Sequence, residues 1–349
     1  MVRVTGCPAR YDEELGYWVV DDPAQARGVL LDPETFRPDN AVLAHTPLSV
    51  KALRVLSAVG FALPPALANN AGESHRPIRA AVARFFSPAR VAAVEPLTRR
   101  LTADRVAAAR ARLAAGGQVD LVAAVAAEPP ALVLMHLLGL TGVDVPALKA
   151  WSLDSLELFW GWPDADRQLE LAHSAAEFYA WLRTRTSAAR QDGGDDLFGV
   201  LVALGLTDEE VCAVGYFLLI AGQETTTQLI STAFQRSVGQ ELADVEGVLR
   251  EASSVPTWRR VTSTAALVGE AELPAGAPVL LGLSGRGGSA DLAFGVGIHR
   301  CLGAGLARLE TRVALECAEE LLGESRLVEE PPMIDLLSFR APRRLLVVR

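Results

Sequence analysis

A glycine-rich loop near the C-terminus presents one cysteine immediately before a helical stretch. The loop reads Phe294-Gly-Val-Gly-Ile-His-Arg-Cys301-Leu-Gly303. Gly295 and Gly297 allow backbone conformations that are closed to other residues, and Gly303 lets the following helix lie close to the loop. At the start of a helix, the dipole and the free N–H groups favour the thiolate form of Cys301. The loop is therefore suited to present a sulfur ligand to a flat macrocycle, although a glycine-rich loop with one cysteine is more often a plain turn.

The length and composition agree with one large domain. At 349 residues, with 50% hydrophobic and 21% charged residues, the chain can bury a large core, and we expect a single domain over residues 1–349. No N-terminal apolar run approaches the length that spans a bilayer, and the first residues lack a signal-peptide pattern. The sequence therefore predicts a cytoplasmic protein with no membrane partner.

Charge and cysteine content argue against several classes of site. The formal net charge of −9 and the aromatic content of 6% disfavour nucleic acid as a partner. The cysteines show no C-x-x-C pairing, so a zinc site, a disulfide framework and a covalently attached c-type haem are poorly supported. These cysteines are Cys7, Cys212, Cys301 and Cys317.

Helical periodicity dominates the rest of the chain. Apolar and polar residues follow the three-to-four spacing of amphipathic or buried helices over residues 79–86, 91–114, 119–140, 165–189, 208–237 and 303–322. Strand patterns are short and cover residues 17–20, 279–283 and 345–348. The sequence therefore predicts a mainly α fold with small β-sheets.

A second motif, Ala221-Gly-Gln-Glu-Thr-Thr226, interrupts a long apolar helical segment. Glycine inside a helix costs about 1 kcal/mol relative to alanine. An acid beside a threonine in an apolar helix costs more unless both side chains are satisfied. Either a functional site or a polar notch between two helices could offset these costs, and the residues alone leave both interpretations open.

The third motif, Glu73-Ser-His75-Arg-Pro-Ile-Arg79, predicts an anion-binding helix N-terminus. His75 and Arg79 are four residues apart and share one helical face. Ser74 can cap the helix, and Pro77 is tolerated because it falls in the first turn. A helix N-terminus that carries both basic side chains on one side is an anion site. Taken singly, each basic residue would more often be an ordinary surface charge.

Together, the three motifs resemble those of the cytochrome P-450 superfamily. The loop fills every fixed position of the haem-binding signature Phe-Gly-x-Gly-x-His-x-Cys-x-Gly. The helical segment is similar to the oxygen-activating motif Ala/Gly-Gly-x-Asp/Glu-Thr-Thr, and the basic pair is similar to the His-x-x-x-Arg that holds a haem propionate. The resemblance extends over nearly the whole chain and implies a trimmed cytochrome P-450 fold with haem b as the cofactor.

The resemblance also implies roles for individual residues. Cys301 would be the axial ligand of the haem iron, and Glu224 and Thr225 would be the catalytic acid–alcohol pair. Other cofactor-binding residues would belong to the propionate site, the helix that faces the haem and the cysteine loop. These are His75, Arg79, Arg260, Ala221, Gly222, Phe294, Gly295, His299 and Gly303. Arg259 could replace Arg260 if the register differs by one residue.

The chain departs from the family pattern in three places. Gly247 stands where the family has the glutamate of its Glu-x-x-Arg motif, which ends here at Arg250. Only a short link joins the oxygen-binding helix to Val245, and residues 285–289 replace the usual meander before the cysteine loop. We expect Arg250 to bond backbone carbonyls or Glu246 in place of the missing glutamate.

The activity implied by the resemblance is that of a haem-thiolate monooxygenase. It would insert one oxygen atom from O₂ into a small or medium organic substrate in bacterial secondary metabolism, with a ferredoxin and a ferredoxin reductase as electron donors. Two alternatives remain. One is a diverged haem-thiolate enzyme that uses peroxide or performs coupling, isomerisation or dehydration, and the other is a non-catalytic haem-binding scaffold.

The substrate pocket would be apolar and partly aromatic. By analogy with the family, it would be formed by residues 40–70, 153–162, 217–222 and 333–339. The apolar side chains expected there include Phe159, Trp160, Trp162 and Leu337. Each of these side chains could equally be core filler.

Overall fold

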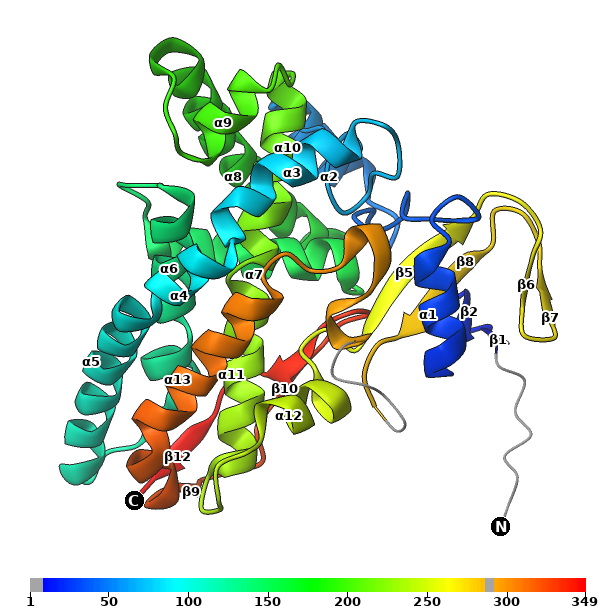
Figure 1. Ribbon diagram of the computed structural model, residues 1–349. Coiled ribbons are helices and arrows are strands. Elements are labelled where there is room, and N and C mark those ends of the chain that lie inside the picture. Colours follow the sequence, from blue (N-terminus) through cyan, green and yellow to red (C-terminus); the bar gives the residue numbers. More distant parts are fainter. Residues whose placement is uncertain (1–8, 286–291) are drawn as a thin grey trace.

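Helices make up most of the molecule, and the largest sheet lies at one side of them (Figure 1). The computed structural model describes residues 9–285 and 292–349. The longer helices are α5 (Glu95–Ala114), α7 (Val145–Trp160), α8 (Ala165–Asp192), α10 (Asp208–Ala221), α11 (Glu224–Ser237) and α13 (Ala304–Gly323). The shorter helices are α1 (Pro23–Leu31), α2 (Val50–Ala58), α3 (His75–Ala83), α4 (Pro88–Ala93), α6 (Glu128–Leu138), α9 (Leu197–Ala203) and α12 (Val245–Ala252). Single turns of 3-10 helix occur at η1 (Arg84–Phe86), η3 (Leu292–Phe294) and η4 (Gly297–His299), and a π-helical turn at η2 (Val122–Ala126).

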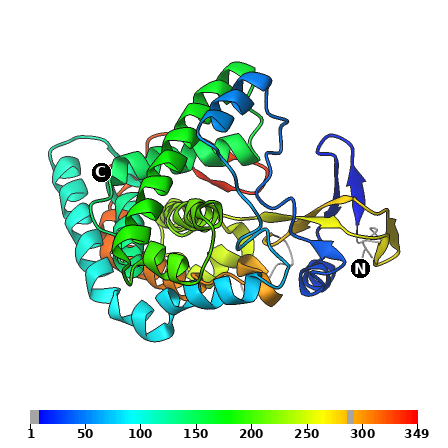
Figure 2. The same cartoon turned by 90° about the horizontal axis from the view of Figure 1, so that it is seen from above.

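Helices α10 and α11 follow one another along a central axis. Seen from above, this yellow-green axis stands near the middle of the helical part and is viewed almost end-on (Figure 2). Helices α8 and α9 pack against α10, whereas α12, α13 and α6 pack against α11. The start of α10 is fixed by a capping box in which Thr207 and Glu210 bond each other's backbone.

The axis is broken at residues 222 and 223. Gln223 has φ −126° and ψ −37°, outside the helical range. The hydroxyl of Thr225 donates to the carbonyl oxygen of Ala221 at 2.7 Å, and so satisfies a carbonyl group at the break. Gly222 is needed there because a Cβ atom would lie 2.9 Å from the carbonyl oxygen of Leu218 and 3.0 Å from the side chain of Leu134.

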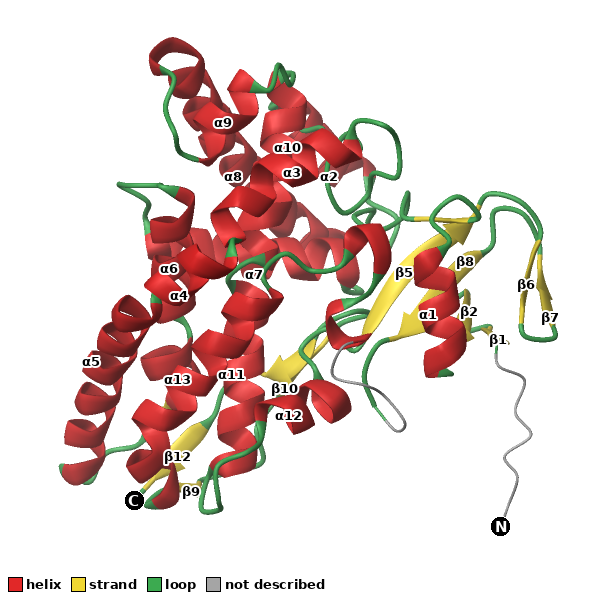
Figure 3. Cartoon of the chain, viewed as in Figure 1, coloured by secondary structure: helices red, strands yellow, loops and turns green. Residues whose placement is uncertain are grey.

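The largest sheet, on one side of the helices, pairs strands from residues 10–37 with strands from residues 257–282 (Figure 3). Its order is β1 (Arg10–Asp12), β2 (Tyr17–Val20), β8 (Pro278–Gly282), β5 (Thr257–Thr262) and β3 (Phe36–Arg37). Strands β2 and β8 are parallel, with Trp18 opposite Val279, and β5 is antiparallel to β8. Smaller sheets are formed by β4 (Val119–Asp120), β12 (Leu346–Val348) and β9 (Arg326–Leu327), by β10 (Met333–Asp335) and β11 (Arg340–Pro342), and by β6 (Ala266–Val268) and β7 (Ala271–Leu273).

The predicted mainly α fold with small β-sheets is confirmed. Several predicted helices are divided at proline or glycine residues. The segment predicted as one helix over residues 119–140 contains β4 and η2 before α6, because Pro129 and Pro130 favour a new helix start. Pro96 likewise separates α4 from α5, and the break at Gly222 divides the segment 208–237. Cys7 and residues 286–289 lie outside the described residues.

No helix within residues 9–285 and 292–349 combines the length and the apolar character needed to cross a membrane.

Candidate active site

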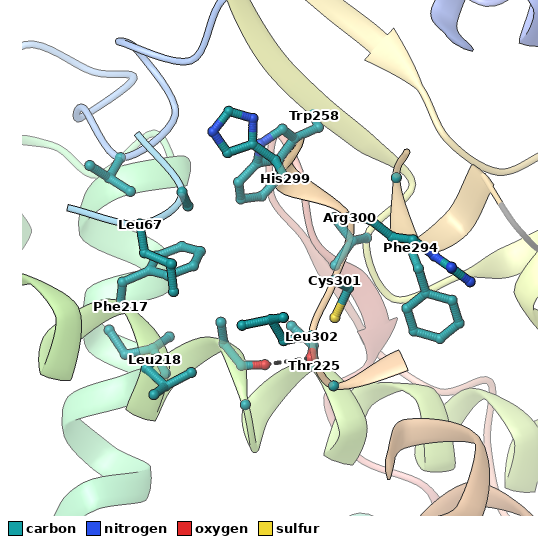
Figure 4. Close-up of a pocket in the computed structure, with 18 of the residues that line it drawn as sticks. Leu67, Phe217, Leu218, Thr225, Trp258, Phe294, His299, Arg300, Cys301 and Leu302 are labelled. Carbon is teal, nitrogen blue, oxygen red and sulfur yellow. Dashed lines mark hydrogen bonds between the residues drawn. The ribbon is translucent and has the colours of Figure 1, made fainter. Parts of the chain in front are cut away.

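A cavity of about 240 Å³ lies where three clusters of buried apolar side chains meet. Leu218 belongs to the first cluster, Leu229 to the second and Leu283 to the third, and all of them line the cavity. The close-up shows Cys301 on one side of the space, and Leu67 and Phe217 on the other (Figure 4). The walls therefore come from the central axis, the cysteine loop and the sheet.

Cys301 is held by a tight loop between η4 and α13. Its N–H donates to the carbonyl oxygen of Phe294 at 2.9 Å. Gly295 and Gly297 have positive φ angles of 66° and 75°, which other residues rarely adopt. At Gly297 a Cβ atom would also lie 2.9 Å from the carbonyl oxygen of Leu30. The predicted need for glycine in this loop is thus confirmed at both positions.

The surroundings of the Cys301 sulfur act on its ionisation in opposite directions. Enclosure by protein raises the pKa of the thiol above its ordinary value, although the residue lines the cavity and is exposed to it. The N–H groups of Gly303 and Ala304 and the charge of Arg79 favour the thiolate and lower that pKa. A metal ion at the sulfur would remove the proton outright. The loop therefore suits a metal-bound thiolate better than a free reactive one.

Basic side chains from α3, β5 and η4 gather at one edge of the cavity. Arg79, Arg260 and His299 line it, and the ring of His75 lies 4.8 Å from that of His299, centroid to centroid. Arg79 donates to the carbonyl oxygen of Arg300 at 2.5 Å, and Arg260 donates to that of Arg259 at 2.7 Å. The sequence-predicted propionate residues are therefore brought together.

Burial disfavours the charged form of each member of this basic cluster. It lowers the pKa of Arg260 to about 10 and that of His299 to about 4, and it lowers the pKa of His75. Within the described residues, neither Arg79 nor Arg260 has a carboxylate within ion-pair distance. His75 Nε2 and His299 Nδ1 are buried without a partner in that same part of the chain. The buried charge of Arg260 calls for an anionic partner, and the two histidines offer unpartnered nitrogens, so the cluster fits the carboxylates of a haem and would hold them if one were bound.

Arg259 does not belong to this cluster. Successive residues of a strand point to opposite faces, and on β5 it is Arg260 that lines the cavity. The guanidinium of Arg259 donates instead to the carbonyl oxygens of Leu43 and Ala41, at 2.8 Å and 3.1 Å. The expected register, with Arg260 at the cofactor, agrees with this placement.

The central axis brings Ala221, Gly222 and Thr225 to the cavity wall, but not Glu224. The Glu224 carboxylate is buried and bonds Lys149 Nζ at 2.5 Å. Lys149, on α7, also bonds Gln223 Oε1 at 2.8 Å and Thr227 Oγ1 at 3.0 Å. Sequence reasoning missed Lys149, because a single lysine in an amphipathic helix carries no signal of a distant partner.

The predicted pocket segments contribute to the cavity unevenly. Phe159, Trp160 and Phe339 line it together with all of residues 217–222 except Leu219. Trp162 does not line it, since its side chain is 53% exposed and meets the ring of His45 edge-on. Leu337 is buried with Tyr17 and Leu280 on the sheet. Those two assignments were wrong, because a composition argument cannot tell which face of a segment points inward.

Helix α12, which should carry the Glu-x-x-Arg motif, makes different side-chain contacts from those expected. Glu246 bonds Arg308 on α13. The side chain of Arg250 is 47% exposed, and among the described residues its ionic neighbour is Glu251 at 3.8 Å. Among the described residues, the Arg250 side chain bonds neither backbone carbonyls nor Glu246, so both expected alternatives are wrong. At the start of α3, Ser74 makes no side-chain cap and accepts a bond from Asn70 instead.

No family model matches the chain. It is 30% identical to erythromycin C-12 hydroxylase of Saccharopolyspora erythraea over 345 residues, which cover 88% of this chain and 82% of the hydroxylase. It is 31% identical to the cytochrome P-450 monooxygenase PikC of Streptomyces venezuelae over 343 residues, which cover 87% and 77%. Among solved structures, it is similar to cytochrome P-450 CREJ in complex with (4-ethylphenyl) dihydrogen phosphate, with a TM-score of 0.88 and 29% identity over 98% of this chain and 94% of that one.

Proposed function

Because the chain belongs to the cytochrome P-450 family of haem-containing monooxygenases, we propose that it binds haem b with Cys301 as the axial ligand and His75, Arg79, Arg260 and His299 at the propionates. The single observation that carries this proposal is the basic cluster at the cavity edge. Neither Arg79 nor the buried Arg260 has a carboxylate within ion-pair distance, and His75 Nε2 and His299 Nδ1 have no partner, among the described residues; the cysteine loop faces the same cavity.

When bound, the haem supplies the iron at which dioxygen is activated. Cys301 would hold the iron as a thiolate, which the N–H groups of Gly303 and Ala304 stabilise. Ala221 and Gly222 leave space at the wall of the cavity, and Thr225 holds its hydroxyl beside the break in the axis. Glu224 would exchange protons with the site through the break, with Lys149 holding its carboxylate between transfers.

The substrate side of the proposal follows from the cavity lining. Leu67, Phe159, Trp160 and Phe217 make it apolar and partly aromatic, which suits a small or medium organic molecule bound in the cavity. The relatives include an erythromycin C-12 hydroxylase and a cyclomarin C epoxidase, which supports hydroxylation or epoxidation in bacterial secondary metabolism. We assign a ferredoxin and its reductase as electron donors, and a cytoplasmic location.

The test is spectroscopic. Purified protein should carry extractable haem b, and reduction under carbon monoxide should give the red-shifted Soret band of thiolate-ligated ferrous haem. Cys301→Ala should abolish the band, whereas Cys317→Ala, which removes a half-buried thiol on α13, should retain it. Colourless protein from haem-replete cells would overturn the proposal. A band that is present but accompanied by turnover with peroxide alone would favour the diverged haem-thiolate enzyme instead.

A further inference from the structure

A two-bonded ion pair links α12 to α13 beside the cysteine loop. Arg308 Nε donates to Glu246 Oε1 at 2.5 Å, and Arg308 Nη2 donates to Glu246 Oε2 at 3.0 Å. The side chains are 27% and 45% exposed, respectively, so water screens the pair only in part. Two parallel bonds fix the plane of a guanidinium as well as its position. Arg308 is thus held in one orientation by a residue of the neighbouring helix.

The same guanidinium lies over an aromatic ring of the cysteine loop. Arg308 Cζ is 4.6 Å from the centroid of the Phe294 ring, well within the range of a cation–π contact. Phe294 ends η3, and its carbonyl oxygen accepts the N–H of Cys301. Three consecutive contacts therefore lead from Glu246 on α12 to the backbone of the residue that carries the sulfur.

On α12, a glycine stands where the family has the glutamate of its Glu-x-x-Arg motif. Gly247 offers no carboxylate, and its N–H is used by the N-cap residue Asp244 at 2.8 Å. Arg250, whose side chain is half-exposed, contributes its backbone carbonyl oxygen to Gly285 rather than its guanidinium to the loop. Within the described residues, the contacts of α12 that reach the cysteine loop through a charged side chain run through Glu246 and Arg308.

We propose that Glu246 and Arg308 take the place of the incomplete Glu-x-x-Arg motif, with Arg308 as a positioning residue that holds Phe294 and, through it, the loop that carries Cys301. The inference rests on the proposed function, because it concerns how the sulfur is presented to haem. Without the guanidinium over its ring, Phe294 is free to shift, and the N–H of Cys301 loses a fixed acceptor. The loop then presents the sulfur less firmly, and the haem is more easily lost.

The experiment compares Glu246→Gln, Arg308→Gln and Arg308→Lys with a matched control, Arg312→Gln. Arg312 lies one turn further along α13 and bonds Glu95 and Glu316 on the surface. The readouts are the share of the carbon monoxide complex that shows the thiolate band at about pH 7 and the rate of haem transfer to apomyoglobin. In Glu246→Gln and Arg308→Gln we expect a smaller share with the thiolate band, and haem transfer about fivefold faster, than in the control. Arg308→Lys should fall between them and the wild type.

The proposal is overturned if Glu246→Gln and Arg308→Gln match Arg312→Gln in both readouts. In that case a normal thiolate band in the wild type would leave the proposed function standing. Should Arg308→Gln fail to accumulate as folded protein, Glu246→Gln decides the question, because its partly exposed side chain can be changed without opening the core. A wild type without the thiolate band would overturn the proposed function itself.

Discussion

At the scale of single residues, two hydroxyl groups on α11 make the same local bond in different surroundings. Thr225 donates to the carbonyl oxygen of Ala221 at the cavity wall, and Thr232 donates to that of Gln228 away from it. With O₂ and a redox chain that delivers electrons from NAD(P)H, Thr225→Ala should lower product formation by about 10²-fold. NAD(P)H should still be consumed, and its electrons should reduce O₂ to hydrogen peroxide. Thr232→Ala should keep product and cofactor consumption coupled. Unchanged coupling in Thr225→Ala would contradict a role in oxygen activation.

Lys149 supplies the charge that the buried Glu224 carboxylate needs. Its side chain is 14% exposed and that of Glu224 is 3% exposed. Removal of one partner therefore leaves the other charge buried without an opposite charge. Lys149→Met should therefore lower the free energy of unfolding by about 3–5 kcal/mol. The double variant Lys149→Met/Glu224→Gln, which removes both charges, should recover most of that loss in urea denaturation. Equal instability of the two proteins would show that the pair is not the cause.

Glu310 on α13 predicts a pH dependence of stability. It is 1% exposed, neither carboxylate oxygen has a hydrogen-bond partner among the described residues, and burial raises its pKa well above the usual value. The folded state therefore keeps the proton that the unfolded state releases above about pH 4.5. The contribution of Glu310 to the free energy of unfolding is greatest below that pH. It falls by about 1.4 kcal/mol per pH unit as the pH rises, until the pKa of the folded state is passed. Urea denaturation of wild type and Glu310→Gln at several pH values should diverge in this way, and parallel curves would contradict it.

At the scale of elements, the break between α10 and α11 depends on close packing against α6. A methyl group at Gly222 would meet the Leu134 side chain at 3.0 Å, so Gly222→Ala should cost about 1–3 kcal/mol. Gly222→Ala/Leu134→Val should recover part of the loss. Gly305→Ala in the first turn of α13 is the control, because its nearest neighbour is Val91 at 4.0 Å and the change should stabilise by about 0.5–1 kcal/mol. Thermal unfolding measures all three, and equal effects of the two single changes would contradict the packing argument.

How far the sequence predicts an element depends on whether its pattern is local. The strand over residues 17–20 was predicted to the residue, since its apolar run is short and bounded. Strand β5 was missed because it contains two arginines, which give the segment a polar sequence although both side chains are buried. The partner of Glu246 was also missed, because helical spacing suggested Arg250 whereas Arg308 comes from another helix. The cysteine loop and the basic cluster could be predicted, because their residues are contiguous or match a known motif.

At the scale of the whole molecule, the basic cluster connects the helical part to the sheet. Arg79 comes from α3, Arg260 from β5 and His299 from η4. Haem-free protein reconstituted with haem dimethyl ester, which lacks propionate charges, should therefore bind it at least about tenfold more weakly than haem b. Arg260→Gln should reduce that difference, whereas Arg312→Gln should leave it unchanged. Equal affinity of the wild type for both compounds would contradict propionate binding by the cluster.

The parallel pairing of β2 with β8 has a consequence for the order in which the molecule is assembled. Trp18 finds its neighbour Val279 only after most of the chain has been synthesised, so until then β2 has only β1 as its partner in the sheet that the structure describes. Strand β5, which carries Arg260, pairs with the same β8. Because β5 can pair with β8 only once residue 282 has been made, and the cysteine loop follows later still, the basic cluster and the cysteine loop come together late in synthesis.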